Sequence, residues 1–162
     1  MRIRHAAFAA VIMAAATSAQ AQITEPRETI AYDGARQIVD TCMTMARAKH
    51  WPIAIWVLDI AGQPVYFASL GASEVGVTTA KFKAETALRT GLPSEQRAQS
   101  VTTPVGQTVT EKIGLFPVAG GIPLMKDGKL IGAVGAGGGR PENGQSVDQL
   151  CARAGIDAVF KK

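Results

Sequence analysis

The chain has 162 residues, of which 47% are hydrophobic and 19% are charged, and its formal net charge at pH 7 is +4. This length predicts a single domain with a sizeable core. The mild positive charge, without a basic stripe interleaved with aromatic residues, argues against a nucleic-acid-binding protein.

The first 21 residues have the pattern of a secretory signal peptide. A basic start precedes an apolar run at residues 6–16, and Ala19 and Ala21 are small residues at the two positions that a signal peptidase reads. The apolar run is too short to span a bilayer, which takes about 20 residues, so an uncleaved membrane anchor is the less favoured alternative. We expect residues 1–21 to be removed and residues 22–162 to form one domain, periplasmic or secreted and without a membrane contact.

The beginning of that domain is predicted to form a helix followed by a hairpin. Apolar residues recur every three or four positions over residues 28–49, which is typical of a helix with one buried face. Two short runs rich in β-branched and aromatic residues follow at residues 53–59 and 64–70, with a glycine turn between them. This pattern predicts two antiparallel strands.

The middle of the chain is less regular. Helical spacing returns over residues 75–92, and a glycine and a proline end it in the expected order. Residues 94–100 are predicted to form a further short helix. We interpret the polar, threonine-rich residues 101–115 as an irregular connection and residues 116–119 as a short strand.

The last part of the chain is predicted to form a second hairpin and a closing helix. Asp127-Gly128 lies between apolar runs at residues 121–125 and 130–136, and this residue pair suits a two-residue turn in which both central residues have positive φ. Ser146 begins a capping-box pattern at the start of an apolar helical face. The order of elements predicts an α+β domain in which helices cover a largely antiparallel sheet.

Two cysteines, Cys42 and Cys151, fall in the first and last predicted helices. In an oxidising compartment such a pair readily forms a disulfide. Two buried free thiols are the alternative, because the distance between the residues cannot be read from the sequence. Both alternatives stay open at this point.

The glycines around the second hairpin are interpreted sterically. The run that begins at Gly135 lacks the spacing of a dinucleotide-binding loop and is not followed directly by a helix. Gly132 and Gly135 lie inside an apolar strand, and Gly120 and Gly121 precede its partner. Glycine within a strand indicates that another backbone or a flat ligand comes close. We therefore expect a shallow surface free of side chains, suited to a ligand or a subunit.

Four stretches of the chain form a pattern that is found in this order in a known family. They are IAIWVLDIAGQPVYF, AKFKAETAL, GLFPVAGGIPLMKDGKLIGAVGAGGG and SVDQLCARAGIDAV. Together they resemble the GlcG/HbpS-like haem-binding (haem-degrading) domain family. The resemblance covers residues 34–159, and its most specific part is the Gly-Gly-Ile-Pro hairpin. One further segment, VTTPVGQTVTEK, is longer and more polar than the family pattern.

The resemblance implies a profilin-like three-layer α/β/α fold with a five-stranded antiparallel sheet. It also implies a homo-oligomer, as a dimer or a larger ring, and a small-molecule ligand that is haem or, alternatively, a corrinoid; having no cofactor is the further alternative. The positions that match the family pattern are Asp59, Gly62, Lys83, Thr86, Gly120, Gly121, Ile122, Pro123, Gly132, Gly137 and Gly138.

Three side chains have functional and structural interpretations. Lys83 would neutralise a ligand carboxylate, or lie on a solvated helix face. His50 would ligate haem iron, or occupy a helix C-terminus, where a cation is favoured. Tyr66 would cover a flat pocket, or simply pack. We expect the ligand between the glycine-rich hairpin and the helix of Lys83.

The expected function is that of an exported haem-binding protein, for haem capture or slow oxidative degradation. No catalytic residue is predicted, and a binding protein is favoured over a fast enzyme. The alternatives are an enzyme that acts on a small organic acid and a non-catalytic accessory or assembly protein.

Overall fold

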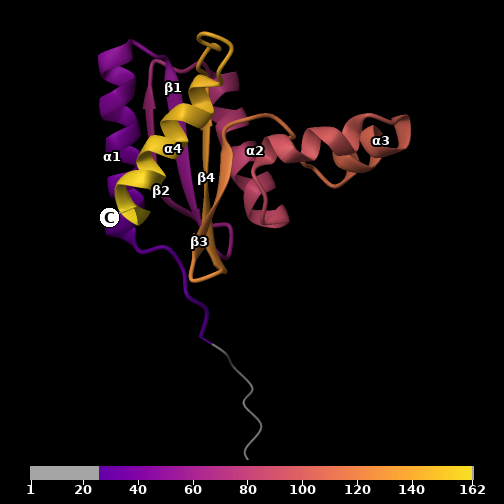
Figure 1. Cartoon of the computed structure of the whole chain (residues 1–162), viewed down its shortest axis with the longest axis horizontal. Helices are drawn as coiled ribbons and strands as arrows, with labels where there is room; N and C mark the ends of the chain where they lie inside the picture. Colours follow the sequence, from indigo (N-terminus) through magenta and orange to yellow (C-terminus); the bar gives the residue numbers. More distant parts are fainter. Residues whose placement is uncertain (1–25, 162) are drawn as a thin grey trace, which may run out of the picture.

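The computed structural model describes residues 26–161, in which a four-stranded antiparallel sheet lies between two layers of helices (Figure 1). The strand order is β2-β1-β4-β3. The predicted signal peptide lies outside the described residues. The elements are α1 (Tyr32–Lys49), β1 (Ile53–Asp59), β2 (Pro64–Leu70), α2 (Glu74–Thr90), the 3₁₀ helix η1 (Ser94–Val101), α3 (Pro104–Lys112), β3 (Gly121–Lys126), β4 (Lys129–Gly137) and α4 (Val147–Phe160).

The α+β class is confirmed, but the expected fifth strand is wrong. Residues 116–119 form no strand, because their backbone groups bond to side chains of neighbouring helices. The Phe116 amide donates to Thr86 Oγ1 over 2.7 Å, and the Val118 carbonyl accepts from the Ser94 hydroxyl. Pro117 also lacks the amide that a strand ladder needs.

One helix boundary and one further helix also differ from the prediction. The first helix begins at Tyr32, because the preceding residues run beside the second hairpin, where the Ile30 amide donates to the Ile131 carbonyl over 2.9 Å. The connection predicted as irregular contains α3. Thr103 caps this helix by accepting the Gly106 amide over 3.1 Å, and a proline occupies its first turn, where a missing amide costs nothing.

Local rules predict the second hairpin and the last helix correctly. Asp127 and Gly128 have φ of 50° and 76° and connect β3 to β4, as a type I′ turn requires. The Ser146 side chain accepts the Gln149 amide and begins α4. The backbone conformation of these residues depends on their near neighbours in the sequence, so the local pattern predicted it correctly.

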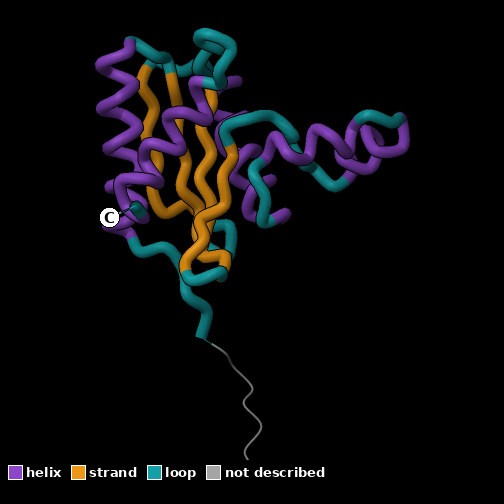
Figure 2. Tube along the Cα trace, viewed as in Figure 1, coloured by secondary structure: helices purple, strands orange, loops and turns teal. Residues whose placement is uncertain are grey.

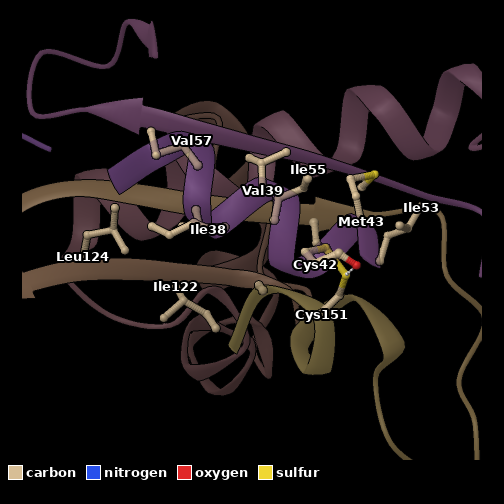
Figure 3. Packing of buried hydrophobic residues seen from close by; sticks show 14 of the residues in the cluster. Ile38, Val39, Cys42, Met43, Ile53, Ile55, Val57, Ile122, Leu124 and Cys151 are labelled. Atoms are coloured by element: carbon tan, nitrogen blue, oxygen red, sulfur yellow. Dashed lines mark hydrogen bonds between the residues drawn. A yellow bond between two sulfur atoms is a disulfide. The ribbon is translucent and has the colours of Figure 1, made fainter. Parts of the chain in front are cut away.

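The larger part of the core lies between the sheet and the layer formed by α1 and α4 (Figure 3). Ile38 and Val39 of α1 are fully buried against Ile53, Ile55 and Val57, the residues of β1 that alternate toward this layer. A disulfide between Cys42 and Cys151 joins α1 to α4, with a Cα–Cα distance of 4.8 Å. The disulfide alternative is therefore confirmed.

Helix α2 covers the opposite face of the sheet, and the segment after it leaves the body of the molecule. In Figure 2, η1 and α3 project sideways from the sheet as a helical arm. We call Ser94–Val101 together with Pro104–Lys112 the arm. None of the described helices is long and apolar enough to span a bilayer.

Candidate functional site

The glycine face of the hairpin is filled by helix α2. A Cβ atom on Gly121 would overlap the carbonyl of Lys83, and one on Gly135 would overlap the carbonyl of Ala80. A Cβ atom on Gly137 would lie 2.8 Å from the amide nitrogen of Ala80. The steric interpretation is correct in that a backbone comes close to these glycines. The expected open surface is wrong, because that backbone belongs to the protein itself.

The other predicted glycines are also in contact with the protein's own atoms. A Cβ atom on Gly132 would overlap the carbonyl of Leu58, and one on Gly138 would lie 3.1 Å from the carbonyl of Pro52. Gly120 has a φ of 124°, and a Cβ atom there would lie 2.9 Å from Cβ of Asp148. Room for a planar ligand is not found at these positions.

Lys83 forms a buried ion pair with Asp148. Its Nζ lies 2.6 Å from Asp148 Oδ2, and the two side chains are 4% and 9% exposed. The second oxygen of Asp148 accepts the Gly139 amide over 2.8 Å. The pair thus connects α2 to the first turn of α4 and to the loop after β4. The ammonium group of Lys83 is therefore buried and paired within the protein. It neither faces solvent nor is free to neutralise a ligand carboxylate, the two interpretations offered by the sequence.

Asp148 is the residue that sequence reasoning missed. It lies 65 positions from Lys83, and an acidic residue in the first turn of a helix is common for electrostatic reasons alone. The only signal would have been the need of a buried lysine for an anionic partner.

Thr86 and Tyr66 are packed by the protein as well. The Thr86 hydroxyl donates to the Phe82 carbonyl over 2.8 Å and accepts the Phe116 amide, so it connects α2 to the segment before β3. Tyr66 packs edge-on against Tyr32 of α1 with ring centroids 5.5 Å apart. Tyr66 and Lys83 therefore lie on opposite faces of the sheet, and the structure does not bring them together.

His50 lies at a recess on the surface. It is exposed, has a φ of 55° and ends α1, where its amide bonds to carbonyls of the last turn. The recess has a volume of about 410 Å³ and lies where α1 and β2 both end. Its lining residues are Arg47, His50, Trp51, Pro52, Leu70 and Gly71.

The chemistry of this recess differs from that of the hairpin. Trp51, Pro52 and Leu70 give it apolar walls, and Arg47 is the basic residue among those that line it. The Trp51 indole nitrogen donates to Glu142 over 3.1 Å, which fixes one wall. The described residues include no group of three or more His, Cys, Asp or Glu side chains that could hold a metal ion.

The fold is shared with several solved structures at low sequence identity. HbpS from Streptomyces reticuli, as a double mutant, has a TM-score of 0.76 at 22% identity, over 90% of this chain and 97% of that one. The Klebsiella pneumoniae protein ORFY has a TM-score of 0.74 at 21% identity, over 86% and 97%. The PduOC:heme complex has a TM-score of 0.72 at 22% identity, over 82% and 96%. No match was found among curated proteins.

These structures show that the chain shares the α+β fold of HbpS. The family model described as "Haem degrading protein HbpS-like" matches residues 30–157. The chain belongs to this HbpS-like family. The family match confirms the resemblance seen in the sequence. It supports haem binding at the level of the family.

Proposed function

We propose that the protein is an exported haem-binding protein and that it binds haem at the His50 recess. The observation that carries this location is that two exposed residues, His50 and Arg47, line the same largely apolar recess of about 410 Å³. Haem presents an iron that accepts imidazole, carboxylates that suit arginine, and a flat apolar ring. The residues of the recess fit each of these parts.

In this proposal His50 holds the iron and Arg47 pairs with a propionate, while Trp51 and Leu70 exclude water from one side of the ring. The bound haem would supply the redox chemistry. Haem capture and slow oxidative degradation are both compatible with this arrangement. Product formation under oxygen with an added reductant distinguishes between them. A corrinoid would meet the same apolar walls and is tested by the same titration with cobalamin.

The alternative function, an enzyme that acts on a small organic acid, loses its main candidate residue. That alternative uses Lys83 as the anchor for a substrate carboxylate, but Asp148 already pairs with this ammonium group at 2.6 Å. The haem proposal does not depend on Lys83.

Haemin titration of residues 22–162 tests the proposal. We expect a Soret band in the wild-type protein and a shifted band in His50→Ala, because His50 is the single histidine of this segment. We expect Arg47→Ala to bind several-fold more weakly, while the matched control Arg36→Ala, also exposed on α1, binds as the wild type does. Absence of a Soret band contradicts haem binding, and an unchanged band in His50→Ala contradicts the iron ligand.

We also propose export to the periplasm or the medium and assembly into dimers or larger rings. The Cys42–Cys151 disulfide supports export, because disulfides persist in oxidising compartments. Cell fractionation followed by N-terminal sequencing tests export, and the expected first residue is Gln22. A full-length cytoplasmic product would contradict this.

A further inference from the structure

The arm carries an apolar stripe that the described residues do not cover. Val105 and Val109 of α3 and Ile113, its C-cap residue, recur at a spacing of four, which places them on one side of the helix. They are 74%, 51% and 44% exposed. The segment is the same one that departs from the family pattern in the sequence. An exposed stripe of this kind on a projecting helix indicates a contact surface.

Helix α3 is poorly supported within its own chain. Its main contact among the described elements is with η1 (Figure 2). An isolated helix of nine residues is marginal in water, because nucleation costs more than so few hydrogen bonds return. A partner that covers the stripe would stabilise the helix.

A second apolar surface lies beside the arm on the outer side of α2. Val75 and Phe82 are two turns apart and therefore lie on the same side of the helix, and they are 71% and 43% exposed. The rings of Phe82 and Phe116 are 6.2 Å apart, so this surface continues to the base of the arm.

The exposed apolar side chains of the arm, of α2 and of the segments between them together have the area of a protein interface. Their summed exposed area is roughly 600 Å², close to the apolar share of a standard interface. The contributing side chains are Val75, Phe82, Leu92, Val105, Val109, Ile113 and Val118.

The charges of this surface suit contact with an identical copy. Two like surfaces can meet around a two-fold axis only if they do not repel each other. The arm has Glu95 and Arg97 in η1 and Glu111 and Lys112 in α3, so its net charge is zero. On α2, the Lys81–Glu85 pair at 3.5 Å is neutral as well.

We propose that a second copy of this chain occupies the surface, with the arm of each copy lying on the outer side of α2 of the other around a two-fold axis. This contact buries both apolar surfaces at once. The contact would be the interface of the proposed assembly, and it does not depend on haem binding at the His50 recess.

The test is the molar mass of residues 22–162 in solution, by size-exclusion chromatography with light scattering. We expect the mass of two copies or a multiple of two, and a twofold or greater fall in mass for the double variant Val105→Glu, Val109→Glu. Both side chains are exposed, so the variant keeps its fold, which circular dichroism checks. Met125→Glu, also at an exposed apolar side chain (44%) but at the end of β3, is the control and keeps the wild-type mass.

Phe82→Ser provides a second test from the opposite surface, and we expect it to lower the mass as well. A monomeric wild-type protein overturns the proposal, as does an unchanged mass in the double variant or in Phe82→Ser. The haemin titration is a separate readout, so failure of the haem proposal and failure of this interface are recognised independently.

Discussion

The buried ion pair between Lys83 and Asp148 provides the sharpest test of the structure. Lys83→Met keeps the length of the side chain and removes its charge, which leaves the carboxylate of Asp148 buried without its cation. Removing one partner of a buried pair costs about 3–5 kcal/mol of unfolding free energy. The Nζ–Oδ2 distance of 2.6 Å and exposures of 4% and 9% place this pair in that class.

The assay is urea unfolding of Lys83→Met beside the control Lys81→Met. Lys81 lies on the same helix and pairs with Glu85 at 3.5 Å, but both side chains are far more exposed. The control is therefore expected to cost less than about 1 kcal/mol. For a domain of this size, the loss in Lys83→Met also lowers Tm by roughly 10 °C or more.

A double variant separates the charge from the packing. Lys83→Met with Asp148→Asn removes the unpaired charge and leaves a side-chain oxygen that can accept the Gly139 amide. We expect this variant to recover at least about 1 kcal/mol of the loss. The reasoning is refuted if Lys83→Met costs no more than Lys81→Met. It is also refuted if Lys83→Met keeps full stability and loses haemin affinity, because Lys83 would then contact the ligand.

Two further predictions concern the disulfide and the glycine face. Replacing both Cys42 and Cys151 by serine should lower the unfolding free energy by about 4–5 kcal/mol, since the disulfide closes a loop of 109 residues; an equal urea midpoint with and without it would contradict this. Gly135→Ala should cost about 1–3 kcal/mol, because the new methyl group overlaps the backbone of α2. In the control Gly34→Ala, the methyl group meets only Cδ1 of Ile30, the far end of a side chain, at 3.1 Å, and the gain in helix propensity should make thermal stability equal or higher.

The sequence by itself determined the elements whose conformation depends on neighbouring residues. The Asp127-Gly128 turn requires positive φ at two adjacent positions, and the Ser146 cap satisfies an amide three residues away. A short run rich in β-branched and aromatic residues likewise predicted the strand β1. The fifth strand was wrong because the bonds that replace it come from Thr86 and Ser94, which no local pattern connects to residues 116–119.

Only the tertiary structure decided how the candidate site residues are used. The strand glycines indicated that something comes close, but a glycine is equally compatible with a ligand, a subunit or a helix. The sequence could not show that α2 fills the space. A lysine likewise does not indicate its partner, and Asp148 reaches Lys83 only because the fold brings the first turn of α4 within side-chain reach of α2. Close approach and charge pairing are relations between distant segments, so their outcome depends on the packing of the whole chain.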